Sequence, residues 1–238
     1  VLSMIDSKKV IRFFDDCAAG WDAGMVKNDG ILEKVLDCAE TGRGKSVLDI
    51  GCGTGVLFHI ILQGECPASW VWIFPEDGLS LPFRGEFDVC VVYNALPHFP
   101  DPAALIAAAF RYLKKAGTLT IAHGMSREAV NRHHRGVMEI SEPLMPADNL
   151  AKLFQPCFRL TSVISDDEKY IVSGKKLQPF FLDKRGKGEL DQRQKPGITN
   201  RIGGAPRFLW AGLTLHPAIF RSQSMDMEVK GTGAYVAA

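Results

Sequence analysis

Apolar residues recur along the chain in two patterns, one with the spacing of helices and one with the near-continuous runs of buried strands. Several helical stretches also begin with a residue that favours helix starts, such as Ser7 and Ser126 at the beginning of two of them. We expect helices over residues 7–25, 28–40, 55–64, 101–117, 126–134 and 146–158. We expect strands over residues 46–50, 70–74, 87–93, 118–123, 159–166 and 169–176.

The segment "DPAALIAAAFRYLKKAG" gives the strongest helix prediction in the chain. Asp101 suits the N-cap, and Pro102 suits the first helical position. Lys114 and Lys115 would lie in the last turn, where positive charge is favourable, and Gly117 would end the helix. The pattern predicts one continuous helix as far as this glycine.

Strands and helices alternate up to about residue 176, which predicts an α/β fold with a mostly parallel sheet and helices on both faces. The last two strands follow each other directly, so we expect an antiparallel hairpin at the end of the sheet. We therefore predict a Rossmann-like domain over residues 1–177. Residues 178–238 have no clear period, and we interpret them as an irregular basic tail that need not be ordered.

The tail differs from the domain in charge. The whole chain has a formal net charge of +1, but residues 176–238 carry +5 and the rest carries −4. One apolar stretch, "FLWAGLTLHPAIF" at 208–220, leaves two arrangements open: a loose tail, or a segment docked on the sheet. The small overall charge gives no support for a nucleic-acid partner.

The turn after the first strand reads Asp49-Ile-Gly51-Cys-Gly53-Thr-Gly55. Glycines at this place let the backbone turn tightly and let a ligand lie against it. A dinucleotide-binding turn would read G-x-G-x-x-G, whereas this one reads G-x-G-x-G. Asp49 would repel a pyrophosphate and attract an amine or a sulfonium, so the turn disfavours a nicotinamide dehydrogenase.

This turn, two later stretches and one earlier stretch resemble one family. "VLDIGCGTG" resembles motif I of the class I S-adenosylmethionine (SAM)-dependent methyltransferases. "NALPHFPDP" and "LKKAGTLTIAH" follow in the order typical of the small-molecule enzymes similar to the menaquinone/ubiquinone C-methyltransferases. "FFDDCAAGWD" resembles the N-terminal segment that folds over the cofactor. The resemblance covers residues 4–176 and implies a Rossmann-like fold that binds SAM.

The resemblance also implies roles for individual residues. Asp49 would orient the amino-acid end of SAM, and Asn94 and Ala95 would pass beside its methionine portion. Phe14 and Trp21 would either pack in the core or cover the cofactor. The implied cofactor-binding set is Asp49, Gly51, Cys52, Gly53, Gly55, Asp77, Asn94 and Ala95.

The segment after motif I is shorter than the family pattern. The family has a strand ending in an acid, a helix and a further strand before the "LPF" segment, but residues 63–79 hold one strand and little else. One strand–helix unit is therefore expected to be missing. Asp77 takes the adenine-contacting position by alignment, and Glu76 is a candidate ribose ligand. An inactive methyltransferase-like protein with an incomplete cofactor pocket is the alternative to an active enzyme.

Four histidines, His98, His123, His133 and His134, fall at or beyond strand ends, where a base could deprotonate an acceptor. We take His98 as the candidate catalytic base. The six cysteines form no C-x-x-C pair, so no metal site is expected, and reduced thiols favour the cytoplasm. No signal peptide or membrane span is expected. The predicted reaction moves a methyl group to an O, N or C atom of a small molecule.

Overall fold

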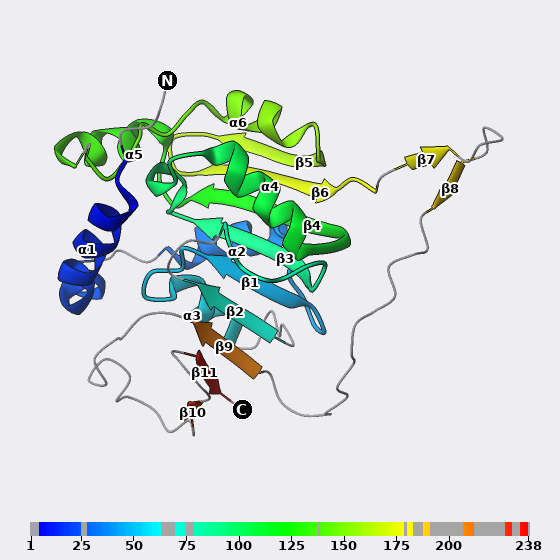
Figure 1. The fold of residues 1–238 in the computed structure, drawn as a ribbon. Helices are drawn as coiled ribbons and strands as arrows, with labels where there is room; N and C mark the ends of the chain where they lie inside the picture. The colour runs from blue at the N-terminus through cyan, green and yellow to red at the C-terminus, as the bar shows by residue number, and fades with distance from the viewer. Residues whose placement is uncertain are drawn as a thin grey trace.

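The protein is described by a computed structural model in which the β-sheet forms the centre and helices cover both of its faces (Figure 1). The structure describes residues 5–24, 28–62, 70–74, 79–137, 139–178, 180–182, 188–190, 207–211, 227–229 and 234–237.

The sheet has the order β10-β11-β9-β2-β1-β3-β4-β6-β5 among the described residues, where the first three strands are β10 (Met227–Val229), β11 (Ala234–Ala237) and β9 (Arg207–Ala211). The pairs β2–β1, β1–β3 and β3–β4 are parallel, and β4–β6 and β6–β5 are antiparallel. The predicted α/β fold, with its antiparallel hairpin at the end, is confirmed. The strands of this central part are β1 (Ser46–Ile50), β2 (Trp70–Phe74), β3 (Phe87–Tyr93), β4 (Leu113–His123), β5 (Phe158–Ser165) and β6 (Tyr170–Lys176).

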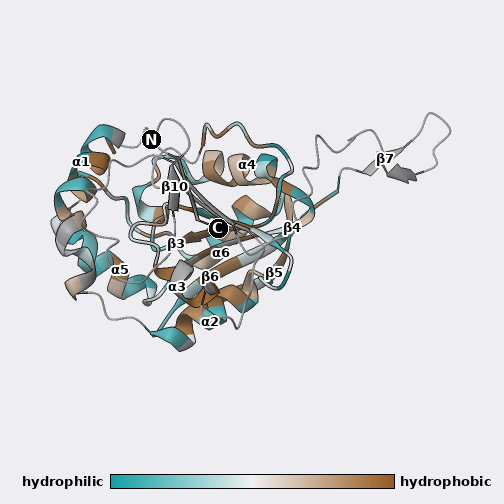
Figure 2. Cartoon of the chain, turned by 90° about the horizontal axis from the view of Figure 1, so that it is seen from below, coloured by the Kyte–Doolittle hydropathy of each residue, from teal (hydrophilic) through white to brown (hydrophobic). Residues whose placement is uncertain are grey.

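Two apolar clusters, one on each face, hold the helices on the sheet. Cys90 and Val92 of β3 belong to the cluster that includes α4 and α6, while Val89 and Val91 belong to the cluster that includes α2 and α3. This alternation explains why β3 is apolar at nearly every position. Figure 2 shows the apolar sides of α2 and α4 turned toward the sheet from opposite directions. The helices are α1 (Ser7–Cys17), η1 (Ala18–Gly24), α2 (Asp29–Cys38), α3 (Val56–Leu62), η2 (Leu96–His98), α4 (Pro102–Tyr112), α5 (Arg127–His133), η3 (His134–Gly136) and α6 (Ala147–Phe154).

The predicted cap of the first helix was wrong by one residue. Asp6 is the N-cap of α1: its backbone is extended, and its carboxylate accepts a hydrogen bond from Lys8 N at 2.9 Å. Ser7 is already helical. Asp and Ser serve equally well at this position, so the sequence could not separate the two neighbours.

The predicted end of the long helix was also wrong. Helix α4 stops at Tyr112, and Leu113 is extended with ψ 138°. Lys114 and Lys115 belong to β4, where the pairing with β3 shifts register. Gly117 allows close packing rather than ending the helix, since a Cβ there would lie 3.0 Å from the Asp88 carbonyl oxygen.

Asp88 ties β1, β3 and β4 together at the amino end of the sheet. Its carboxylate accepts hydrogen bonds from Ser46 N at 2.9 Å, Ser46 Oγ at 2.8 Å and Lys114 Nζ at 2.7 Å. Partial burial raises the pKa of this carboxyl, but the bonds from Lys114 and Ser46 outweigh it, and the pKa lies below its ordinary value of 3.8.

We expect Asp88→Asn to lower the free energy of unfolding at pH 7 by about 1–3 kcal/mol, because Asn cannot accept the same charge-assisted bonds. A pKa that is lowered by folding stabilises the protein above pH 3.8, and this contribution is lost as the pH falls through the folded value. Urea unfolding should therefore show a larger difference between variant and wild type at pH 7 than at pH 3. An equal difference at both pH values would contradict this account.

One strand, β2, lies between α3 and β3 in the described residues, as expected for a shortened segment. The next place outward in the sheet is taken by β9 (Arg207–Ala211), which runs parallel to β2. Of the two arrangements left open for this part of the tail, the structure has the docked one. The other strands of the tail are β7 (Phe180–Leu182), β8 (Gly188–Leu190), β10 (Met227–Val229) and β11 (Ala234–Ala237).

Candidate functional site

The glycine-rich loop joins the carboxyl end of β1 to the start of α3. Gly51, Gly53 and Gly55 all have positive φ, at 72°, 54° and 82°. A Cβ on Gly51 would lie 2.9 Å from the Ala95 Cβ, so only glycine lets the loop pack on the segment after β3. Gly53 is exposed, and a Cβ there would meet nothing within 4 Å. The backbone at Gly53 is therefore open to a ligand, while Gly51 packs against Ala95 on the protein side of the loop.

Asp49 lies under this loop and is 2% exposed. Its Oδ1 atom has no hydrogen-bond partner among the described residues. Burial raises the pKa of its carboxyl to about 7. A buried carboxylate oxygen without a partner is costly, and a ligand that brings a positive N–H group would remove the cost.

Cys52 is buried in the loop and contributes its backbone. Gly55 N donates a hydrogen bond to the Cys52 carbonyl oxygen at 2.9 Å, which closes the turn. Burial raises the pKa of the Cys52 thiol, and the charge of Asp49 raises it further. The thiol therefore stays protonated at neutral pH, and Cys52 is not a nucleophile.

Asn94 and Ala95 lie just beyond β3, beside the loop. Asn94 has a φ of 54°, which asparagine tolerates better than most residues. Its side-chain Oδ1 accepts a hydrogen bond from Gly124 N at 2.9 Å, and its N–H donates to the Ala122 carbonyl oxygen at 2.9 Å. The ends of β3 and β4 are thus held together next to Gly51.

Seven of the predicted cofactor-binding residues therefore meet at one edge of the sheet: Asp49, Gly51, Cys52, Gly53, Gly55, Asn94 and Ala95. Asp77, the eighth, lies outside the described residues, as does Glu76.

His98 lies in η2, close to this edge. Its Nδ1 is 2.9 Å from the Ile140 carbonyl oxygen. A carbonyl can only accept, so Nδ1 carries the proton and Nε2 keeps a free lone pair. Burial lowers the pKa of His98, and the bond to Ile140 offsets this in part. The ring is therefore uncharged at neutral pH and can accept a proton through Nε2.

Two further histidines lie near His98. The ring of His134 is 5.2 Å from that of His98, between ring centroids. Burial, with the neighbouring imidazoles, lowers the pKa of His123 to about 3 and that of His134 to about 4. The sequence indicated that these residues follow strands, but only the fold brings them together. Among the residues that the structure describes, no group of three His, Cys, Asp or Glu side chains could hold a metal ion.

The hydroxyl of Tyr170 is a member of this region that sequence reasoning missed. Tyr170 is the first residue of β6 and pairs with His123, the last residue of β4. Its hydroxyl is buried without a hydrogen-bond partner among the described residues. The sequence signal that could have identified Tyr170 is its position at the start of the second hairpin strand. That position places it at the same edge of the sheet as the end of β4.

Helix α1 covers this region from one side. The ring of Phe14 is 4.9 Å from that of His98 and 5.4 Å from that of Trp21, in edge-on arrangements. Figure 1 shows α1 beside the strand ends, next to α5 rather than within the core. Of the two readings left open for Phe14, contact with the site region is the one that this geometry favours.

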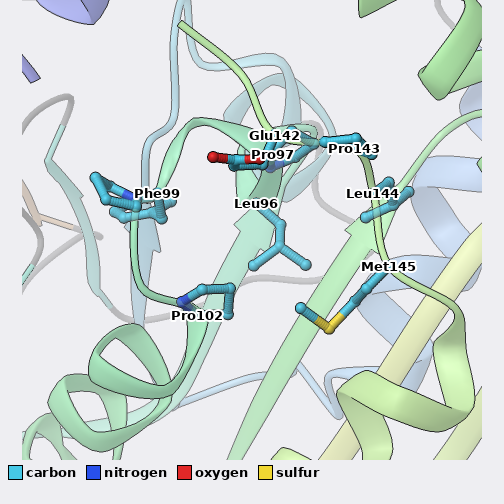
Figure 3. Close-up of a pocket in the computed structure, with 9 residues that line it drawn as sticks. Leu96, Pro97, Phe99, Pro102, Glu142, Pro143, Leu144 and Met145 are labelled. Atoms are coloured by element: carbon cyan, nitrogen blue, oxygen red, sulfur yellow. The ribbon is translucent and has the colours of Figure 1, made fainter. Parts of the chain in front are cut away.

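A cavity of about 240 Å³ lies between the segment after β3 and the loop before α6 (Figure 3). Its lining is mostly apolar, with Glu142 as the one acidic side chain among the lining residues. Phe99 belongs to the lining, and its ring would be 3.7 Å from a Cβ on Gly51. The cavity therefore adjoins the glycine-rich loop through Phe99. It is lined by Leu96, Pro97, Phe99, Pro100, Pro102, Glu142, Pro143, Leu144 and Met145.

The fold and this loop agree with the comparison to known families. Residues 27–156, more than half of the chain, match the family described as a methyltransferase domain. The chain belongs to this methyltransferase domain family.

Curated relatives match part of the chain. A ubiquinone biosynthesis O-methyltransferase from Pseudomonas paraeruginosa is 33% identical over 97 residues, covering 31% of this chain and 42% of that protein. One from Thiobacillus denitrificans is 25% identical over 144 residues, covering 49% and 62%. The chain thus spans less than two thirds of the length of either relative. The alignment with the Pseudomonas paraeruginosa protein is 97 residues long, but it includes only 31% of the 238 residues of this chain. Some aligned residues of that relative therefore have no counterpart in this chain.

Solved structures share the fold at low sequence identity. A chain from the complex of the Haloferax volcanii Trm112 methyltransferase activator with a methyltransferase has a TM-score of 0.57 at 15% identity, covering 68% of this chain and 97% of that one. The geranyl diphosphate C-methyltransferase of Streptomyces coelicolor has a TM-score of 0.52 at 10% identity, covering 63% and 76%. No described helix is long and apolar enough to cross a membrane.

Proposed function

We propose that the chain is a SAM-dependent methyltransferase that acts on a small molecule. The observation that carries this proposal is Asp49, a buried carboxylate with an unpartnered oxygen beneath a glycine loop whose outer face is open. The ammonium group of SAM matches the missing partner in charge and in hydrogen-bonding capacity. The Streptomyces coelicolor structure of the same fold contains S-adenosylhomocysteine, which further supports the cofactor.

Different residues of the chain would bind different parts of SAM. The loop at Gly51, Gly53 and Gly55 would lie along the amino-acid portion, and Asp49 would accept hydrogen bonds from its ammonium group. Asn94 and Ala95 would border the methionine chain, and Asp77 is proposed as the adenine contact. Bound SAM supplies a methyl group already activated by a sulfonium, so the protein mainly has to align the acceptor and exclude water.

We propose His98 as the base that takes a proton from the acceptor. Its neutral ring, with the proton fixed on Nδ1 by Ile140, leaves Nε2 free for this step. The curated relatives are named as O-methyltransferases, which favours an oxygen acceptor over nitrogen or carbon. The adjacent apolar cavity suits an acceptor with an apolar body. His98 is thus the proposed catalytic residue, and a hydroxylated small molecule is the proposed acceptor.

We propose that residues 1–177 form the methyltransferase domain, whose sheet is extended by β9 of the tail, and that the basic tail, 178–238, takes no part in binding SAM. The five described cysteines are free thiols, which supports a reducing compartment, the cytoplasm. Partners other than the small-molecule acceptor are not required by this function. A methyltransferase-like protein with an incomplete cofactor pocket is the alternative, favoured by the short segment between α3 and β3.

Calorimetric titration of SAM into the purified chain tests the proposal, with NADH as the comparison ligand. We expect SAM to bind and NADH not to bind. SAM should bind about 10- to 150-fold more weakly than to a full-length relative, because the shortened segment lacks the usual ribose acid and a hydrogen bond to a charged group is worth roughly 1.5–3 kcal/mol.

Absence of SAM binding would support the alternative of an incomplete pocket. Binding of NADH in place of SAM would overturn the class of reaction. Affinity equal to that of an intact relative would show that the shortening does not affect the ribose contact.

A further inference from the structure

Three buried polar atoms near the carboxyl edge of the sheet have no hydrogen-bond partner among the described residues: His123 Nε2, His134 Nδ1 and the Tyr170 hydroxyl. We call these three side chains the inner polar trio. His123 is 2% exposed and Tyr170 is 0% exposed. Buried polar groups are almost always hydrogen-bonded in folded proteins, so three unpartnered atoms in one region need an explanation.

The trio comes from three elements that converge at the carboxyl edge of the sheet. His123 ends β4 and Tyr170 begins β6, with their ring centroids 6.0 Å apart and nearly perpendicular. His134 begins η3 and brings its ring within 5.2 Å of the His98 ring. The trio therefore meets the imidazole proposed as the base through His134.

The trio presents an uncharged, hydrogen-bonding surface at neutral pH. Burial keeps the pKa of the Tyr170 hydroxyl well above its ordinary value, so the hydroxyl remains a donor. Charges of both signs act on this hydroxyl, since Arg127 lowers its pKa and Asp148 raises it. His133, whose ring is 5.7 Å from that of His134, contributes to the low pKa of His134.

An uncharged surface of this kind selects for an uncharged ligand group. A carboxylate or an ammonium would lose its hydration without gaining a formal counter-charge from the trio itself. A neutral oxygen can accept a hydrogen bond from the Tyr170 hydroxyl and from an imidazole N–H.

We propose that the inner polar trio binds a neutral oxygen of the methyl acceptor, a carbonyl or hydroxyl that is not the methylated atom. The trio would thereby determine which acceptors are oriented toward His98. The proposal rests on the proposed function of this site. It adds a second polar group to the acceptor and makes Tyr170 a specificity-determining residue.

Tyr170→Phe tests the proposal first through stability, without any ligand. It removes only the unpartnered hydroxyl and keeps the ring against His123, so the melting temperature should stay the same or rise. Tyr112→Phe is the matched control, because Tyr112 is equally buried and its hydroxyl accepts a hydrogen bond from Leu81 N at 3.0 Å. Tyr112→Phe should lower the melting temperature. An equal loss in Tyr170→Phe would show a structural role and overturn the proposal.

The second test uses two probes of similar shape, 4-hydroxyacetophenone, which has a carbonyl, and 4-ethylphenol, which lacks it. Binding is followed by NMR of labelled histidine rings, with and without S-adenosylhomocysteine. We expect wild type to bind the ketone about 5- to 10-fold more tightly, and Tyr170→Phe to lose this preference, as the loss of one hydrogen bond predicts.

Equal binding of the two probes to wild type would overturn the proposal, as would no shift of the His123 and His134 resonances with either. SAM affinity is measured on the same samples and should be unchanged in Tyr170→Phe. A wild-type chain that fails to bind SAM would contradict the proposed function instead. The probe titration without S-adenosylhomocysteine tests the trio independently of cofactor binding, so failure of the proposal and failure of the proposed function can be distinguished.

Discussion

Valine at position 53 is expected to abolish SAM binding in a chain that still folds. Gly53 has a φ of 54°, a conformation that β-branched residues avoid at a cost of about 1–3 kcal/mol. A Cβ at this position meets no protein atom within 4 Å, so the new side chain would occupy the open face where SAM is proposed to lie. Both effects act on the ligand site and leave the apolar core unchanged.

Calorimetry of Gly53→Val with SAM, together with circular dichroism, checks this prediction. Gly42→Val is the matched control, because a Cβ at Gly42 also meets nothing within 4 Å and Gly42 lies in the loop between α2 and β1. The control should bind SAM like wild type. Unchanged SAM binding by folded Gly53→Val would remove this loop from the site.

Asp49→Asn is expected to make the SAM-free protein more stable at pH 8 while weakening SAM binding about 10- to 150-fold. Burial raises the pKa of this carboxyl from 3.8 to about 7, so the folded chain holds the proton more tightly than the unfolded chain. Wild-type stability therefore falls as the pH rises from 3.8 to 7, and the cost is fully present above pH 7. The shift corresponds to at most about 4 kcal/mol.

Urea unfolding of wild type and Asp49→Asn from pH 4 to pH 8 measures this effect. The variant should equal wild type near pH 4 and gain progressively above it, because asparagine does not titrate. Asp88→Asn, at the opposite end of the strands, should show the reverse sign at pH 7 and normal SAM binding. A constant difference between Asp49→Asn and wild type across this range would show that Asp49 does not carry the buried charge.

Much of the fold could be predicted from periodicity because the core imposes it. The continuous apolar run of β3 indicated burial on both faces, and Val89 and Val91 do face one cluster while Cys90 and Val92 face the other. The end of α4 could not be predicted, because Leu113, Lys114 and Lys115 have good helix propensity. Tertiary contacts override that preference: Leu113 pairs with Phe87, and Lys114 reaches Asp88.

The site was predicted in part, for a similar reason. The glycine spacing and Asp49 are local signals, and the positive φ angles of Gly51, Gly53 and Gly55 follow from them. Contacts between distant segments have no such signal. The approach of His134 to His98 and the pairing of Tyr170 with His123 depend on sheet order and register, which the sequence does not state.

The most direct test of the central claim is a titration of SAM followed by the backbone amide resonances of ¹⁵N-labelled protein. The claim is that SAM lies on the loop after β1, above Asp49. The amides of Gly51, Gly53 and Gly55 should shift in proportion to occupancy, together with Asn94, while the amide of Gly42 stays unchanged. Binding of SAM without any shift at the three loop glycines would contradict the account.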